Sequence, residues 1–135
     1  MIVVDASVVV DLVLGPGSPA GDFLAASLLS GTVACAPHLI DAEIGQVVRR
    51  YELGGEIDEP QATAALADAM ELPIVRYPHT RLVDRAFQLR RNMTMYDGLY
   101  LALAEVLEVP FVTGDSALAA VPGCNARVEF VATSK

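Results

Sequence analysis

The order of apolar and polar positions predicts short strands that alternate with longer helices. Five segments have the character of strands, at residues 2–4, 33–36, 73–75, 110–112 and 128–131. The first of them is apolar throughout instead of alternating, which is typical of a strand buried on both faces of a sheet. The chain is therefore expected to open on a strand that helices cover from both sides.

Most of the chain between these strands shows the spacing of helices. Ile40, Ile44 and Val48 recur at helical intervals until Gly54 and Gly55 end the run. The predicted helices span residues 7–14, 19–29, 39–53, 60–70, 79–91 and 95–107, with Pro37 at the expected start of the third and a helical turn at 116–120. Such alternation predicts an α/β fold with a mostly parallel central sheet flanked by helices. A length of 135 residues suits a single domain.

Composition narrows the class of protein further. No apolar run approaches the roughly 18 residues that cross a bilayer, so no membrane segment is expected. Asp5 and Asp11 interrupt the apolar opening, which argues against a signal peptide and favours a cytoplasmic location. The two cysteines, Cys35 and Cys124, are expected to be buried free thiols. A net charge of −8 argues against simple polyanion binding, although eight of the nine basic residues are Arg, which suits phosphate recognition.

Four acidic residues stand where a folded domain tolerates charge poorly. Asp5 ends the first strand, and Asp115 follows the fourth. Glu43 and Asp97 lie near the starts of two amphipathic helices. Ligands of open α/β sheets bind beyond the carboxyl ends of the strands, so we expect the four acids to converge there. Four carboxylates would balance two divalent cations, and oxygen ligands favour Mg²⁺ or Mn²⁺.

Each acid also has a purely structural interpretation. Asp5 and Asp115 could cap the helical segments that follow them. Asp97 could form a capping box with Thr94, and Glu43 could complement a helix dipole. These interpretations are reasonable one by one, but four caps beside four buried segments are a weaker explanation than one shared site.

Three further residues support a shared site. Ser7 and Thr113 place hydroxyls two residues from Asp5 and Asp115, where they could orient carboxylates or satisfy the local backbone. Gly98 inside a helix costs about 1 kcal/mol relative to Ala, so a close approach beside Asp97 is expected.

These residues together resemble a known family. The matching segments are residues 2–7 (IVVDAS), 37–43 (PHLIDAE), 48–50 (VRR), 96–100 (YDGLY) and 112–115 (VTGD). In this order and spacing, the chain is similar to PIN domains, and specifically to VapC-type toxins of bacterial toxin–antitoxin pairs. The resemblance implies one PIN domain over residues 1–135 and a metal-dependent endoribonuclease. The catalytic and metal-binding acids would be Asp5, Glu43, Asp97 and Asp115, with Ser7 and Thr113 nearby; the fourth acid is the least uniform in the family.

The resemblance also implies partners and a mechanism. Such proteins commonly form homodimers, can join larger assemblies, and are held inactive by a cognate antitoxin. The acids would hold one or two Mg²⁺ or Mn²⁺ ions that activate a water for in-line attack on an RNA phosphodiester. His38 and His79 are interpreted as structural or surface residues. The candidate contacts to RNA or to the antitoxin are Arg49, Arg50, Arg81 and Arg85. The alternative function is a non-catalytic PIN-like module that binds RNA or protein and uses its acids as caps.

Overall fold

Five parallel strands form one sheet in the computed structural model, which describes residues 1–134 of the chain. Along the chain the elements are β1 (Ile2–Val4), α1 (Ala6–Val13), α2 (Pro19–Leu29), β2 (Ala34–Pro37), α3 (Ile40–Leu53), α4 (Glu59–Glu71), β3 (Ile74–Tyr77), η1 (Thr80–Leu82), α5 (Val83–Gln88), α6 (Met95–Leu107), β4 (Phe111–Thr113), η2 (Ser116–Ala120) and β5 (Val128–Phe130). The α/β fold with a parallel central sheet is confirmed. Among the described residues, no helix is long and apolar enough to cross a membrane.

The strand order β3-β2-β1-β4-β5 places β1 at the centre of the sheet. On one side of β1, β2 pairs with β1 and β3 pairs with β2. On the other side, β4, which comes later in the chain, pairs with β1. In the register of the central pair, Val4 lies opposite Val112. The order of strands thus reverses between β1 and β4, and in open α/β sheets a ligand crevice forms at such a reversal.

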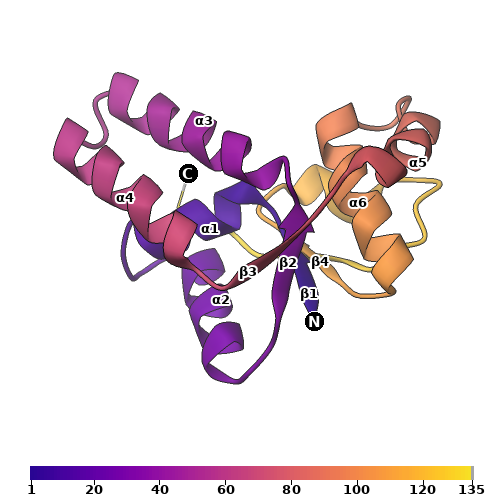
Figure 1. Ribbon diagram of the computed structural model, residues 1–135, viewed down its shortest axis with the longest axis horizontal. Helices are drawn as coiled ribbons and strands as arrows, with labels where there is room; N and C mark the ends of the chain where they lie inside the picture. The colour runs from indigo at the N-terminus through magenta and orange to yellow at the C-terminus, as the bar shows by residue number, and fades with distance from the viewer. Residues whose placement is uncertain (135) are drawn as a thin grey trace.

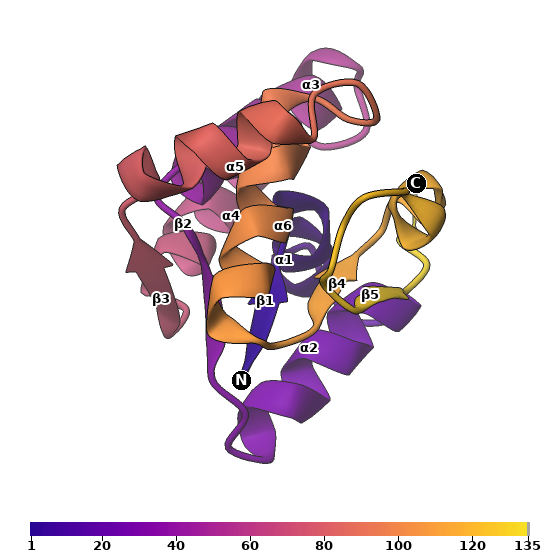
Figure 2. The same cartoon turned by 90° about the vertical axis from the view of Figure 1, so that its right-hand side faces the viewer.

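Helices cover both faces of the sheet. In Figure 1, α1 to α4 lie on one side of the strands, and α5 and α6 lie on the other. Figure 2 shows α6 running across the strands from the α5 end, with the start of α3 at the same end of the molecule. The starts of α3 and α6 therefore meet the edge of the sheet where β1 and β4 end.

The core lies along β1, β4 and α6. Val3 and Val4 are fully buried, as predicted for a strand covered on both faces. Every residue of α6 from Gly98 to Ala104 is buried as well. A Cβ atom at Gly98 would lie 3.1 Å from both Cα and Cβ of Ala86 on α5. Glycine therefore allows α5 to pack closely against α6 next to Asp97, which confirms the expected close approach.

Two predicted boundaries are wrong. Pro37 is the last residue of β2, opposite Tyr77 of β3, and not the start of a helix. The pairing of β2 with β1 ends at Cys35, two residues earlier, so a proline at position 37 removes no donor from that ladder. The helix expected over residues 79–91 is shorter, since a 3-10 turn precedes α5 and the helix ends at Gln88. Apolar spacing cannot distinguish these tighter turns from an α-helix, and 3-10 turns are frequent at helix ends.

Candidate active site

Asp5 is held rigidly at the carboxyl end of β1. Its carboxylate accepts hydrogen bonds from the Ser7 hydroxyl (2.7 Å) and the backbone N–H of Val8 (3.2 Å) at Oδ1. The Thr113 hydroxyl at the end of β4 donates to Oδ2 (2.5 Å). Asp5 is thus the N-cap of α1. Its bond from Thr113 also links the ends of β1 and β4, the two strands between which the strand order reverses. Burial raises the pKa of Asp5, and these hydrogen bonds oppose that rise.

Glu43 and Asp97 approach the same point from two helices. Glu43 lies in the first turn of α3, and Asp97 lies in the first turn of α6, which Thr94 caps by accepting the backbone N–H of Asp97. Burial raises the pKa of Glu43, and the charges of Asp97 and Asp5 raise it further. Burial also raises the pKa of Asp97, with added repulsion from Asp115 and Asp5.

These three acids line one cavity of about 210 Å³. Its lining residues are Asp5, Ala6, Ser7, Glu43, Gln46, Val47, Arg50, Asp97 and Tyr100. They come from the end of β1 and from the helices α1, α3 and α6. The convergence of Asp5, Glu43 and Asp97 that the sequence predicted is therefore present in the structure.

Asp115 lies beside this cavity and not in its lining. The residue is exposed, and its carboxylate caps η2 by accepting the backbone N–H of Ala117 (3.0 Å). Its charge still reaches Asp97, whose pKa it raises. Asp115 is thus a cap, as its structural interpretation predicted, and it acts on the site through its charge and not as a lining residue.

The acids of the cavity have no cationic partner among residues 1–134. The ion pairs within that range join Arg76 to Asp41, Arg85 to Glu105 and Arg127 to Glu129. Two acids at the start of α3 differ in this respect. Asp41 accepts two hydrogen bonds from Arg76, whereas Glu43, two residues later, lines the cavity and makes no ion pair with the described residues. The cavity therefore holds three acids against one basic residue, Arg50, and none of the ion pairs within residues 1–134 joins them.

The arginine and histidine candidates fall in different places. Arg50 is exposed and lines the acidic cavity. Arg85 instead makes two hydrogen bonds to Glu105 (2.7 and 2.9 Å), and Arg49 and Arg81 are exposed outside the cavity lining. The two histidines, His38 and His79, are also absent from that lining.

Two polar lining residues were not predicted from the sequence as parts of the site. Tyr100 is one helical turn beyond Asp97 on α6, and Gln46 is one turn beyond Glu43 on α3. Residues three apart on a helix share a face, so this spacing was an available signal. The Tyr100 hydroxyl is buried and has no hydrogen-bond partner within the described residues.

The donor set suits a hard divalent cation. All acidic groups of the cavity offer carboxylate oxygens, which Mg²⁺ and Mn²⁺ prefer. Within residues 1–134, however, no three His, Cys, Asp or Glu side chains stand close enough to hold one ion without moving. Because hydrogen bonds fix Asp5, the movement would fall to Glu43 and Asp97, which are only partly buried.

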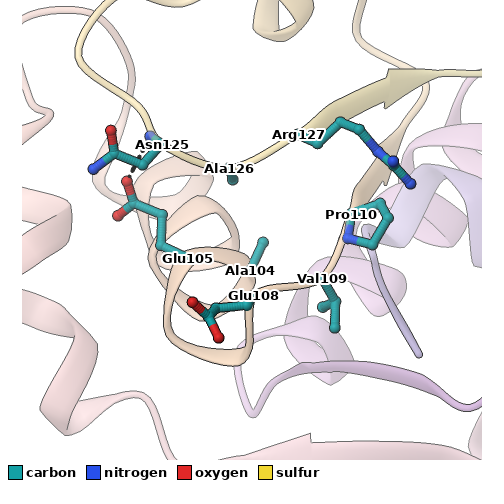
Figure 3. A pocket seen from close by; sticks show the side chains of 8 residues that line it. All are labelled: Ala104, Glu105, Glu108, Val109, Pro110, Asn125, Ala126 and Arg127. Atoms are coloured by element: carbon teal, nitrogen blue, oxygen red, sulfur yellow. Dashed lines mark hydrogen bonds between the residues drawn. The ribbon is translucent and has the colours of Figure 1, made fainter.

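A larger cavity, of about 430 Å³, lies at the opposite edge of the sheet, where β4 and β5 begin (Figure 3). Figure 3 shows the Glu105 side chain turned toward the backbone N–H of Asn125, which donates to it at 2.7 Å. Arg85 pairs with the same carboxylate, and Arg127 pairs with Glu129. Glu105 and Arg127 therefore already have partners, and Glu108 is the one further charged residue of that lining. The smaller cavity, where three acids meet, is the better candidate for chemistry.

Comparison with known proteins agrees with this geometry. The PIN domain family model matches residues 2–123. The chain is 48% identical over 130 residues to ribonuclease VapC1 of Mycobacterium tuberculosis, with 96% of each chain covered. It is 39% identical over 132 residues to ribonuclease VapC12 of the same organism, with 98% of this chain and 100% of the relative covered.

A solved structure shares the fold. The crystal structure of VapC20 from Mycobacterium tuberculosis, described as a toxin that cleaves the sarcin–ricin loop, superposes with a TM-score of 0.66. The match covers 94% of this chain and 99% of that one at 16% identity, so it bears on the fold alone. The family model and the two sequence relatives lead to one assignment: the chain belongs to the PIN domain family and groups within it with the VapC proteins.

Proposed function

We propose that this protein is a Mg²⁺- or Mn²⁺-dependent endoribonuclease toxin that a cognate antitoxin holds inactive. The observation that carries the proposal is the meeting of Asp5, Glu43 and Asp97 in one cavity, at the point where the strand order reverses. The relatives named as ribonucleases supply the reaction class. Acids with raised pKa values in a cleft are typical of a functional site.

The residues of the cavity have different tasks in this proposal. Asp5, fixed by Ser7, Val8 and Thr113, is the rigid oxygen ligand. Glu43 and Asp97 complete the ligand set from the two helices, with Asp115 beside the cavity. When bound, a divalent cation lowers the pKa of water and offsets the charge that develops on a phosphodiester. The protein contributes the positions of the carboxylates and their negative charge, which a bound cation would offset.

Arg50 is our candidate for the RNA backbone. Arg50 is a lining residue of the cavity and makes no ion pair with the described residues. A planar guanidinium matches a phosphate with two parallel hydrogen bonds. Contact with RNA predicts that Arg50→Ala weakens RNA binding and reduces its salt dependence. Arg85 is a poor candidate, because Glu105 already occupies its guanidinium group.

Partners form the second part of the proposal. Several large apolar side chains are exposed, among them Leu29, Leu53, Phe87 and Val106. Burial of such side chains by another protein would be favourable. We therefore propose a homodimer that binds the antitoxin, and light scattering of the protein alone and of the complex measures both states.

The test of the enzyme is a conservative change at the site. Asp97→Asn should abolish Mn²⁺-dependent cleavage of labelled RNA while circular dichroism shows an unchanged fold. Asp68→Asn is the matched control, since Asp68 is exposed on α4 and is not part of the cavity lining. Full activity of Asp97→Asn would contradict the proposal. If the unmodified protein cleaves RNA and Asp97→Asn does not, mapping new RNA 5′ ends in cells that express the protein would identify the substrate.

The alternative is a PIN-like module that binds RNA or protein without catalysis. Two of the acids do cap helical segments, Asp5 on α1 and Asp115 on η2, as that alternative expects. Metal titration separates the two functions. A nuclease site should raise the melting temperature when Mn²⁺ is added, whereas capping acids alone should give no Mn²⁺-dependent stabilisation.

A further inference from the structure

Tyr100 carries a buried hydroxyl that the fold does not need. The side chain is 1% exposed, and its ring stacks on Phe111 of β4 with centroids 5.7 Å apart and planes at 19°. Phenylalanine would fill the same space and make the same stacking contact. The hydroxyl oxygen is buried and unpartnered among the described residues, and such a group destabilises a protein unless something pairs with it. Its purpose is therefore to be sought in the cavity that Tyr100 lines.

The substrate is a poor partner for this hydroxyl. The oxygen exposes less than 1 Å² to solvent, so an RNA phosphate cannot reach it without displacing the lining of the cavity. The partner must be a neighbouring group of the protein, and the acids that face Tyr100 are Glu43, Asp5 and Asp97.

Glu43 is the acid that remains open to this hydroxyl. Both oxygens of Asp5 already accept hydrogen bonds, from Ser7 and Val8 at Oδ1 and from Thr113 at Oδ2. Glu43 has the longest side chain of the three acids and the Tyr100 hydroxyl beside it, near enough to affect its carboxylate but short of hydrogen-bond geometry. A small rotation of Glu43 would close that gap.

We propose that Tyr100 is a positioning residue of the acidic site: its hydroxyl donates to one carboxylate oxygen of Glu43 and leaves the other oxygen free for a divalent cation. This inference rests on the proposed metal-dependent function. The ring is 1% exposed and stacks on Phe111, whereas the Glu43 side chain is only partly buried and so has more room to rotate. Tyr100 would thus select the rotamer of Glu43 that brings the acids together. Partners of metal ligands typically change metal affinity or activity by about 10–100-fold when removed.

The experiment compares two Tyr→Phe changes on the same helix. Tyr100→Phe should weaken Mn²⁺ binding, measured by calorimetry, by about tenfold or more. It should also lower the kcat for RNA cleavage without raising KM, and leave the metal-free melting temperature equal or higher. Tyr96→Phe is the matched control, because Tyr96 is 58% exposed and next to Asp97 but outside the cavity lining.

The outcomes separate this inference from the function on which it rests. If the unmodified protein binds Mn²⁺ and Tyr100→Phe binds it as tightly as Tyr96→Phe, the role of Tyr100 is refuted while the nuclease proposal stands. If the unmodified protein binds no Mn²⁺ and cleaves no RNA, both are refuted.

A second measurement does not depend on the folding of a variant. In the unmodified protein saturated with Mg²⁺, proton NMR should show a slowly exchanging tyrosine hydroxyl that is absent before Mg²⁺ is added. A hydroxyl that exchanges equally fast with and without Mg²⁺ would refute the hydrogen bond to Glu43.

Discussion

Thr113 offers the sharpest test of how the site is built. Its side chain is fully buried at the end of β4, where the hydroxyl donates to Asp5 Oδ2 (2.5 Å) and accepts the backbone N–H of Asp115 (3.0 Å). Thr113→Val keeps the shape of the side chain and removes both hydrogen bonds. Asp5 would then keep only the bonds from Ser7 and Val8.

The expected cost is about 1–2 kcal/mol in the free energy of unfolding at neutral pH. A hydrogen bond to a charged group contributes about 1.5–3 kcal/mol. The released N–H of Asp115 belongs to an exposed residue and can bond to water. Burial of the methyl group that replaces the hydroxyl stabilises the folded protein by about 0.8 kcal/mol and so offsets part of this loss.

The pH dependence of this cost has a definite sign. The bond from Thr113 favours charged Asp5 and lowers its pKa, against the rise that burial causes. Its contribution is therefore present when Asp5 is ionised and lost as the pH falls through the pKa of folded Asp5. Thr113→Val should destabilise the protein more at pH 8 than at pH 4.

Urea unfolding at several pH values, with a chelator present, measures this difference. Thr63→Val is the matched control, because Thr63 is exposed on α4 and surface changes usually stay within about 0.5 kcal/mol. A cost for Thr113→Val that does not vary with pH, or that equals the cost at Thr63, would refute the reasoning.

Two further predictions concern stability. Burial raises the pKa of Glu43 in the folded state, so its contribution to metal-free stability is present below the unfolded pKa and lost as the pH rises through the folded pKa. Glu43→Gln should therefore raise the metal-free melting temperature at pH 7 but not at pH 4. A lower melting temperature of this variant at pH 7 would contradict the prediction. Gly98→Ala should gain about 1 kcal/mol in helix propensity but lose about 1–3 kcal/mol to crowding against Ala86, 3.1 Å away, a net loss of up to about 2 kcal/mol in urea unfolding. Gly45→Ala on α3, with nothing within 4 Å, should instead stabilise the protein by about 1 kcal/mol.

Local sequence signals were sufficient for the elements and for much of the site. The unbroken apolar character of residues 2–4 predicted a strand covered on both faces, and the alternation of strands and helices predicted the parallel sheet. Asp5, Glu43 and Asp97 could be grouped because parallel strands end at a common edge. The predicted boundaries were wrong at Pro37 and at residues 79–91, where a strand end and a 3-10 turn share their apolar spacing with a helix.

The sequence by itself determined the fold class, the family and the identity of the acids, because periodicity, turn residues and short motifs are properties of neighbours along the chain. Only the tertiary structure decided which of the candidate residues line the cavity. Asp115 lies outside the lining, Arg85 is paired with Glu105, and Tyr100 brings a buried hydroxyl to the cavity of the acids. Those facts depend on how β1, α3, α5 and α6 pack, because packing brings together side chains from segments far apart in the chain, as it does for Arg85 and Glu105.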